Sequence, residues 1–256
     1  MAAERSRREW ADRMTRSMLV SWRAVAAGSP GAIVLEPEGV LGIVLPAVPE
    51  RSVFNAVLYD DADGLAAVLD DLRDAYDAAG VEKWTVWAPA DDEATAGRLQ
   101  AAGHALDSTP LAMGLELERF TEPDPGDLEW TADGSISAVH RVNDAAYGWA
   151  SGTFERGLGE PPPGTWRIYE ARLDREPASV VLTTDVDGDC GVWWVGTVPD
   201  AQGRGLAGRL LGAALAEARE RGMETATLQA SARGAPVYTR LGFENVGELR
   251  MWERRR

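Results

Sequence analysis

The chain has 256 residues, of which 45% are hydrophobic and 26% charged, and its formal net charge is −15 at pH 7. Its length exceeds the roughly 100 to 150 residues of a usual domain, so we expect two compact units. The acidic excess argues against nucleic acids and anionic membranes as partners, since both require basic surfaces. A single cysteine, Cys190, permits no intramolecular disulfide and no thiolate metal site, and His104 and His140 lack metal-ligand spacing, so we expect no metal. With no apolar run of about 20 residues and no signal-like N-terminus, the expected location is the cytoplasm.

The first half opens on an amphipathic helix, because apolar residues recur every four positions, at Trp10, Met14, Met18 and Trp22. Two short apolar runs are separated by the turn-prone residues 36–39, and this pattern predicts a hairpin. The elements predicted for this half are a helix over 4–27, strands over 32–35, 40–45 and 53–59, a helix over 61–79, a strand over 83–88, a helix over 91–102 and a strand over 112–117.

The stretch 120–127 contains two prolines among charged residues, a composition typical of a linker. We therefore predict two domains, 1–124 and 125–256. The elements predicted for the second half are a strand over 128–131, a helix over 135–147, strands over 165–173, 179–185 and 191–198, a helix from 206 to 222, a strand over 225–230, a helix over 235–241 and a strand over 244–252. The similar order of elements in the two halves indicates a duplicated unit.

One strand of the second half ends near Pro199 and runs through glycines into a helix, with the sequence VGTVPDAQGRGLA over 195–207. Glycines let the backbone approach a phosphate closely, and the first N–H groups of a helix have no intrahelical partners. Arg204 adds positive charge. The stretch therefore predicts a binding site for an anion such as pyrophosphate.

The same glycines also fit the G-x-G-x-x-G of dinucleotide-binding folds, since Gly203, Gly205 and Gly208 follow a strand and open a helix. That pattern requires an acidic residue about 20 positions further on, where Gln229 and Ala230 stand. Too little chain follows for the further strand-helix repeats of such a sheet. A nicotinamide oxidoreductase, which would bind NAD, is therefore the less favoured class.

The stretch is more similar to the acetyl-CoA signature of the GCN5-related N-acetyltransferases (GNAT), Gln/Arg-x-x-Gly-x-Gly/Ala, with Gln202, Gly205 and Ala207 in the signature positions. The sequence PVYTRLGF over 236–243 resembles the later CoA-binding helix of this family and its tyrosine, here Tyr238. The resemblance covers residues 125–256. It implies an α/β (α+β) fold of two GNAT-like domains, each a mixed, mostly antiparallel sheet flanked by helices, with a splayed central strand in the C-terminal domain.

The resemblance also implies the site residues. Tyr238 would give its proton to the departing CoA thiolate, although a packing role is the alternative for this aromatic residue. No motif places the general base, for which Glu155, Glu170 and His140 are candidates. The residues implied to bind acetyl-CoA, the acyl donor substrate, are Val195, Gly196, Thr197, Gln202, Gly203, Arg204, Gly205, Leu206, Ala207 and Ser231.

Two further segments bear on the acceptor. The Gly/Pro-rich loop 148–164, with Trp149 and Phe154, stands where members of this family shape the acceptor site. Trp193 and Trp194 are adjacent on one strand and are expected to face opposite sides, so one of them packs in the core and the other is a candidate for the acceptor cleft. Core packing of both tryptophans is the favoured alternative.

The first half departs from the family pattern, because acidic residues stand at 60, 61 and 63 where a glycine-rich phosphate loop would be. Acidic side chains repel pyrophosphate, so we expect residues 1–124 to form a degenerate GNAT-like domain. The leading prediction is an acetyl-CoA-dependent N-acetyltransferase acting on the primary amine of a small molecule or peptide. A non-catalytic acyl-CoA-binding sensor is the alternative. The acceptor, the preferred acyl chain and the oligomeric state, a homodimer among the options, stay open.

Overall fold

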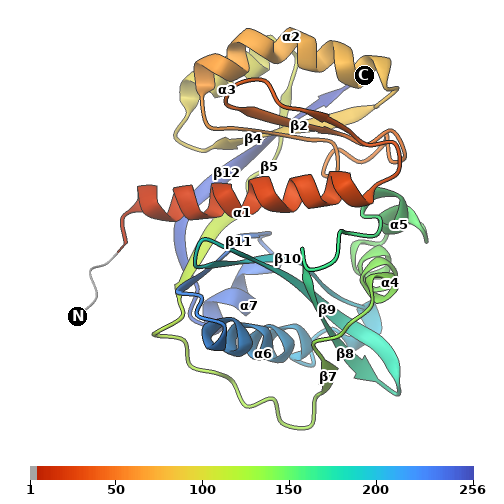
Figure 1. Cartoon of the computed structure of the whole chain (residues 1–256), viewed down its shortest axis with the longest axis vertical. Helices are drawn as coiled ribbons and strands as arrows, with labels where there is room; N and C mark the ends of the chain where they lie inside the picture. Colours follow the sequence, from red (N-terminus) through yellow and green to blue (C-terminus); the bar gives the residue numbers. More distant parts are fainter. Residues whose placement is uncertain (1–4) are drawn as a thin grey trace. The chain divides into compact units, whose positions relative to one another are not determined.

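The computed structural model describes residues 5–256 and forms two compact units (Figure 1). Unit 1 comprises the chain up to Ser21 together with Ala112–Glu155 and Pro162–Val246. Unit 2 comprises Trp22–Leu111, Arg156–Pro161 and Gly247–Arg256. Neither unit is therefore one continuous stretch of the chain.

The sheet of unit 2 has the strand order β1-β2-β3-β4-β12, with β5 also paired to β12. All pairs are antiparallel except β3 with β4, which is parallel and is connected through α2. The bounds are β1 Ile33–Leu35, β2 Val40–Val44, β3 Ala56–Tyr59, α2 Ala62–Ala78, β4 Lys83–Pro89, α3 Glu93–Ala101, β5 Ala105–Ser108 and β12 Glu244–Arg255. Its core includes Tyr76 stacked on Trp84 with ring centroids 4.6 Å apart.

The sheet of unit 1 has the strand order β6-β11-β10-β9-β8-β7. Helices α4 and α6 both pack on β9 and β10, whose apolar residues form the core. The bounds are β6 Leu111–Glu116, β7 Glu129–Thr131, α4 Ile136–Tyr147, α5 Thr153–Gly157, β8 Arg167–Leu173, β9 Glu176–Val186, β10 Asp189–Thr197, the 3-10 turn η1 Pro199–Ala201, α6 Leu206–Glu220, β11 Thr225–Ala230 and α7 Ala235–Arg240. The predicted mixed, mostly antiparallel sheet is confirmed.

The central strand β10 separates from its parallel neighbour β11. The two pair only from Asp189 to Gly191, opposite Thr225 to Thr227, although both strands run on beyond this point. On the other side, the register between β10 and β9 shifts between Trp193 and Gly196. This bulge and the early end of pairing form the splayed strand that the sequence predicts.

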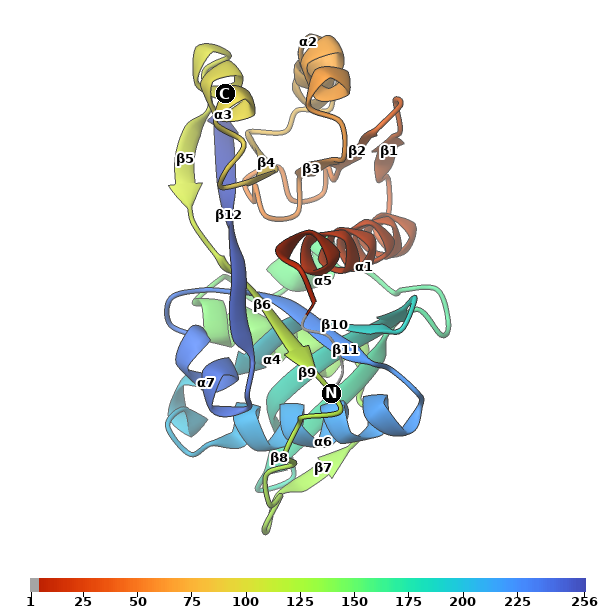
Figure 2. The same cartoon turned by 90° about the vertical axis from the view of Figure 1, so that its left-hand side faces the viewer.

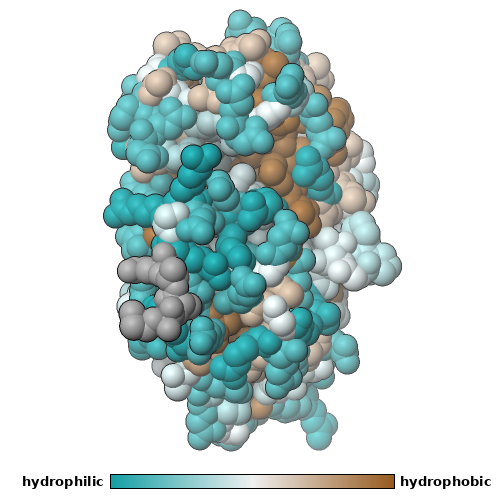
Figure 3. All heavy atoms as spheres, turned by 60° about the vertical axis from the view of Figure 1, so that its left-hand side comes forward, coloured by the Kyte–Doolittle hydropathy of each residue, from teal (hydrophilic) through white to brown (hydrophobic). Residues whose placement is uncertain are grey.

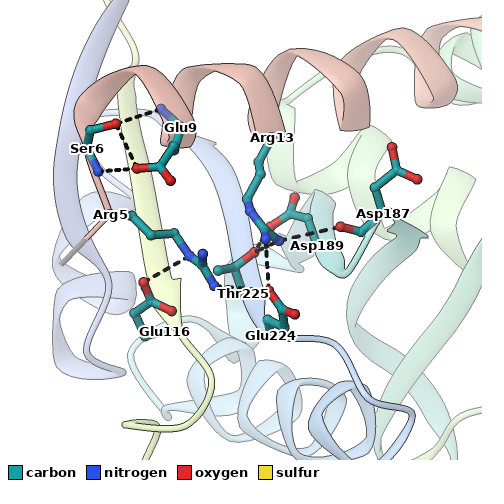
Figure 4. Close-up of polar contacts among 9 residues, drawn as sticks. All are labelled: Arg5, Ser6, Glu9, Arg13, Glu116, Asp187, Asp189, Glu224 and Thr225. Atoms are coloured by element: carbon teal, nitrogen blue, oxygen red, sulfur yellow. Dashed lines mark hydrogen bonds and ion pairs between the residues drawn. The ribbon is translucent and has the colours of Figure 1, made fainter. Parts of the chain in front are cut away.

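The first helix, α1 Arg7–Gly28, buries its predicted apolar stripe, because Trp10, Met14, Met18 and Trp22 are all between 2% and 8% exposed. The N-terminal part of α1 belongs to unit 1. An ion-pair network secures it there (Figure 4). Arg13 Nη2 lies 2.8 Å and Arg5 Nη2 lies 3.1 Å from Glu224 Oε2.

Beside this network Figure 4 also draws Asp189, a buried carboxylate at the start of β10. Its Oδ2 accepts hydrogen bonds from Ser17 Oγ of α1 (2.8 Å) and Thr227 Oγ1 (2.6 Å), and its Oδ1 accepts one from Thr225 Oγ1 (2.7 Å). Because an unpaired buried charge is costly, these three hydroxyl groups hold α1 and β11 against the start of β10.

The units differ from the predicted division into 1–124 and 125–256. The stretch 120–127 lies inside unit 1 and covers α6, where Arg209 Nη1 donates to Pro125 O and Arg219 Nη1 donates to Phe120 O, both at 3.1 Å. A Cβ on Gly212 of α6 would collide with Pro123. The proline-rich composition of this stretch therefore belongs to a segment that packs on a helix, and not to a linker between two domains.

The last strand of each half completes the sheet of the other unit. Strand β6 follows the elements of unit 2 in the chain yet lies beside β11 of unit 1. Strand β12, visible as one long arrow in Figures 1 and 2, begins in unit 1 and pairs through its second half with β4 in unit 2. This exchange is a second reason why a single cut near residue 124 does not separate the units.

The predicted elements otherwise match the structure within a few residues, and two elements are additional. Strand β5 was not predicted, since its four residues are all exposed and lack alternation. Helix α5 lies within the predicted loop 148–164.

The face drawn in Figure 3 is mostly hydrophilic with a narrower hydrophobic band. Across residues 5–256 no helix has the length and apolarity needed to cross a membrane, and no group of acidic, His and Cys side chains is arranged to hold a metal ion.

Candidate functional site

A cavity of about 530 Å³ opens in unit 1 at the start of α6. Its wall combines the loop after β10, the first turn of α6 and one side of α7. Six predicted acetyl-CoA residues lie on this wall, namely Thr197, Gln202, Gly203, Gly205, Leu206 and Ala207. The structure therefore brings the glycine loop and the later helix to one place.

The backbone of the glycine loop is arranged to bind an anion. Gly203 and Gly205 have φ values of 77° and 76°, a region that glycine enters without strain, and a Cβ on either would meet no atom within 4 Å. Gly205 caps α6 without a side-chain hydrogen bond. Among residues 5–256, no acceptor pairs with the N–H groups of 203–208, so these donors point to open space at the positive end of a 15-residue helix.

Three arginines supply positive charge to the same cavity: Arg209 on α6, Arg233 before α7 and Arg240 on α7. Sequence reasoning named none of them. Arg209 follows the capping Gly205 by one helical turn, and this spacing was the available signal. Arg204, which was predicted to bind the anion, is exposed and does not line the cavity.

Gln202 braces the loop through its side chain. Its Nε2 donates to Thr197 O at 3.0 Å, and its Oε1 accepts a hydrogen bond from Arg233. Leu206, in contrast, is 2% exposed and packs with Ala178 and Ala201, so only its backbone N–H is available to a ligand. Each of these positions therefore acts in a different way, one through a side chain and one through the main chain.

The bulge of β10 is held by Asn143 of α4. Trp194 has a φ of 47°, a backbone conformation rare for a large side chain, and its carbonyl accepts a hydrogen bond from Asn143 Nδ2 at 3.2 Å. Asn143 is fully buried, and its Oδ1 has no hydrogen-bond partner in the described part of the chain. A Cβ on Gly196 would collide with this Oδ1, which explains the glycine at that predicted site position.

Tyr238 lies on α7 with its ring packed edge-on against Phe243 at a centroid distance of 6.0 Å. The side chain is half-buried. Burial of the hydroxyl raises the pKa of Tyr238 above its ordinary value of 10, and the neighbouring Tyr147 hydroxyl raises it further. Tyr238 is therefore neutral and keeps its proton at physiological pH, as a general acid must.

Tyr147 joins three other aromatic residues near the bulge. Phe154 is fully buried and lies 5.6 Å from Tyr147, 5.2 Å from Trp149 and 5.3 Å from Trp194 between ring centroids. Trp193 is buried and faces the other way, because a Cβ on Gly191 would meet both Trp193 Nε1 and the side chain of Ser17 on α1. The predicted opposite orientation of the two adjacent tryptophans is thus confirmed.

The remaining predicted residues have separate surroundings. Ser231 is exposed and accepts a hydrogen bond from the N–H of Gly234, just before α7. Val195 and Gly196 lie on β10 beyond its last contact with β11 and do not line the cavity. Of the candidate bases, Glu155 is exposed, His140 is half-buried on α4, and Glu170 is buried with its Oε1 2.7 Å from Arg172 Nε.

Comparison with known proteins agrees with this geometry. Residues 164–245, which lie wholly within unit 1, match the family model of the acetyltransferase (GNAT) domain. A search of curated proteins finds no match. The chain is similar to a solved GCN5-related N-acetyltransferase from Kribbella flavida, with a TM-score of 0.66, 18% identity and coverage of 93% of this chain and 95% of that chain.

Two other solved structures extend the likeness. A GCN5-related N-acetyltransferase from Sphaerobacter thermophilus gives a TM-score of 0.58 at 17% identity, covering 96% of this chain and 93% of that one. A tandem GNAT protein from the clavulanic acid biosynthesis pathway gives 0.59 at 14% identity, covering 98% of this chain and 94% of that one. Residues 164–245 thus match the GNAT acetyltransferase domain, and the whole chain has the fold seen in solved GNAT N-acetyltransferases, including a tandem one.

Proposed function

We propose that the protein is an acetyl-CoA-dependent N-acetyltransferase that transfers an acetyl group to a primary amine of a small molecule or peptide. The observation that carries this proposal is the start of α6, where unpartnered N–H groups and glycines with positive φ face a cavity that three arginines also line. Such an arrangement suits the pyrophosphate of CoA. The end of β10, where pairing with β11 has ceased, would lie along the pantetheine arm.

The chain's own residues would then divide the chemistry. The N–H groups of 203–208 and the arginines hold the phosphates, while the main chain near Val195 and Thr197 orients the thioester. The neutral amine attacks the thioester carbonyl carbon, so that a C–N bond forms and the C–S bond breaks. Tyr238 gives its hydroxyl proton to the departing thiolate, the new ammonium group loses a proton to water, and water returns a proton to the Tyr238 phenolate.

Calorimetric titration with acetyl-CoA, with NAD as a control, tests the proposal first. We expect micromolar binding at one site per chain and no response to NAD. One site per chain supports a working unit 1 beside a degenerate unit 2, whereas two sites would contradict the degenerate-domain proposal. Absence of binding would remove both the enzyme proposal and the sensor alternative.

Release of CoA thiol with an amine panel separates the enzyme from a non-catalytic sensor. We expect Tyr238→Phe to lower kcat by about 100-fold while leaving the Kd for acetyl-CoA unchanged, because a phenyl ring keeps the contact with Phe243 but has no proton to donate. Phe243→Leu is the matched control, since it changes the packing of the same ring pair and leaves the hydroxyl. An unchanged rate in Tyr238→Phe would assign Tyr238 to packing.

A further inference from the structure

The aromatic residues beside the β10 bulge are arranged around a buried centre with their outer parts accessible. We call Tyr147, Trp149, Phe154 and Trp194 the aromatic cluster. Phe154 is fully buried at its centre, whereas Tyr147 is 48% exposed and both tryptophans are half-buried. Trp149 stacks on Phe154 with an angle of 25° between ring planes, and Trp194 meets it edge-on at 89°. A cluster that served only as core would be buried throughout; here three of the four rings remain accessible.

The segment that carries Trp149 and Phe154 is fixed by a buried carboxylate. Asp144 of α4 is 5% exposed, and its two oxygens accept hydrogen bonds from Gly152 N at 2.7 Å and Phe154 N at 2.9 Å. Its carbonyl accepts a third from Trp149 N at 2.8 Å. Hydrogen bonds from N–H groups to a charged acceptor are among the stronger ones, so the rings are held in place before any ligand arrives.

The cluster adjoins the place where the thioester is proposed to lie. Trp194 is itself the bulged residue of β10. Asn143, which bonds to the Trp194 carbonyl, and Tyr147 are four residues apart on α4 and so share one face of that helix. The same face therefore presents one residue to the bulge and one to the aromatic cluster.

We propose that the aromatic cluster is the acceptor subsite, and that it selects amines carried on an aromatic or other flat apolar group. This inference rests on the proposed acetyltransferase function. Broad ring faces bind flat apolar groups by stacking and by removing apolar surface from water. The buried carboxylate of this segment, Asp144, offers no polar partner to a ligand, because both of its oxygens are already engaged by backbone N–H groups. Asp144 is a positioning residue in this scheme, because it acts through the rings it holds.

Matched amines test the selectivity in the unaltered protein. Acetylation of 2-phenylethylamine, propylamine and ethanolamine is followed by release of CoA thiol. We expect kcat/KM for 2-phenylethylamine to exceed that for propylamine by tenfold or more, in the range that a pocket filled by an extra apolar group provides, roughly 10- to 200-fold. The gain should appear mainly in KM, since the subsite binds the part of the acceptor that does not react.

Variants locate the subsite. Trp149→Leu should reduce the preference for 2-phenylethylamine over propylamine at least fivefold, and Trp149→Phe, which keeps a ring, should retain most of the preference. Trp130→Leu is the matched control, because Trp130 is a half-buried tryptophan of the same unit on β7, with its ring by Tyr169 and not in the cluster. Calorimetric binding of 2-phenylethylamine to the protein saturated with CoA gives a readout independent of turnover.

The outcomes separate the two proposals. Acetyl-CoA turnover with equal kcat/KM for 2-phenylethylamine and propylamine, or a preference that survives Trp149→Leu, would overturn the aromatic subsite and leave the acetyltransferase function intact. Absence of acetyl-CoA binding would remove the proposed function and this inference together. A binding preference for 2-phenylethylamine that disappears in Trp149→Leu and persists in Trp130→Leu supports the subsite.

Discussion

The starts of α6 in unit 1 and α2 in unit 2 occupy the same place in two similar successions of elements. Each helix follows the third of three consecutive antiparallel strands and connects it to a parallel fourth strand, β3 to β4 and β10 to β11. The α6 start is capped by Gly205 with free N–H groups. The α2 start is capped by Asp61, whose carboxylate accepts hydrogen bonds from Asp63 N at 3.2 Å and Gly64 N at 3.0 Å.

This comparison shows how one architecture can keep or lose an anion site through the first turn of a helix. In unit 2 the chain's own carboxylate occupies the N–H groups that unit 1 leaves open. The positive end of the helix dipole is then already neutralised, and further acidic residues at 60 and 63 would repel a phosphate. We therefore propose that unit 2 is a GNAT-like unit without an acetyl-CoA site.

Gly205→Asp would give α6 the same type of cap as α2 and so remove the difference between the two helix starts. We expect this change to have the largest effect of the variants, a rise in the Kd for acetyl-CoA. The new carboxylate would occupy the N–H groups of the first turn and repel the pyrophosphate. Loss of two charge-assisted hydrogen bonds corresponds to about 4 kcal/mol, or about a 1,000-fold rise in Kd for acetyl-CoA, which calorimetry would detect as loss of binding. Asp tolerates the positive φ of this position better than most residues, so the fold should persist.

Gly205→Asn is the matched control, because it has the same shape and also caps a helix but carries no charge. We expect its Kd to rise by about tenfold. Equal Kd values for the Asp and Asn variants would show that charge at this position is unimportant, and an unchanged Kd in both would place the phosphates elsewhere.

His104 is a buried residue of unit 2, so it should make the stability of this unit depend on pH. Its ring lies edge-on to Trp84 at 4.7 Å, and neither ring nitrogen has a hydrogen-bond partner among residues 5–256. Burial lowers the pKa of His104 from the ordinary 6.5 to about 4, with Arg254 acting in the same direction. Between these values the unfolded chain binds more protons than the folded one. The free energy of unfolding should therefore fall, by about 3 kcal/mol, as the pH drops from about 6.5 to about 4.

Urea unfolding at several pH values measures this fall, and His104→Leu should flatten it over the same window. His140→Leu is the control, because it replaces the other histidine, which is half-buried in unit 1. A pH dependence that His104→Leu leaves intact would mean that other groups cause the acid sensitivity.

Asp61→Ala should have the smallest effect. Removal of this cap should lower the free energy of unfolding by about 1 kcal/mol, whereas Asp61→Asn, which keeps a capping oxygen, should lower it by a few tenths. Thermal unfolding followed by circular dichroism measures both. We expect acetyl-CoA to bind Asp61→Ala still at one site per chain, because the acidic neighbours remain. A second site would show that the cap alone separates the two units.

Much of the fold follows from the sequence because its signals are local. Periodicity identified α1, α2 and α6, and the glycine loop before α6 combines turn chemistry with a helix start within a few residues. The family resemblance predicted that Tyr238 and the glycine loop share one site. The cavity is lined by the glycine loop and by Val237 and Arg240 of α7, whereas Tyr238 is not among its lining residues.

The features that the sequence did not reveal depend on partners distant in the chain. Nothing in the sequence around Asn143 shows that its side chain contacts the bulge of β10. The role of Asp144 likewise depends on hydrogen bonds from N–H groups of the following loop. The arginines of the cavity come from three separate segments. The compact units differ from the predicted division for the same reason, since local composition does not show which sheet a strand joins.

The exchange of β6 and β12 also constrains how the protein forms during synthesis. As the ribosome releases the chain, the residues of β1 to β5 emerge first, yet the strand that pairs with β4 and β5 is made only after the whole of unit 1 has been translated. Early in synthesis β4 therefore presents an unpaired edge, the kind of surface that associates with other nascent chains. Pairs so far apart in sequence form slowly. Completion of unit 2 thus has to wait until β12 has been synthesised, and this interval is when chaperones would protect the protein most.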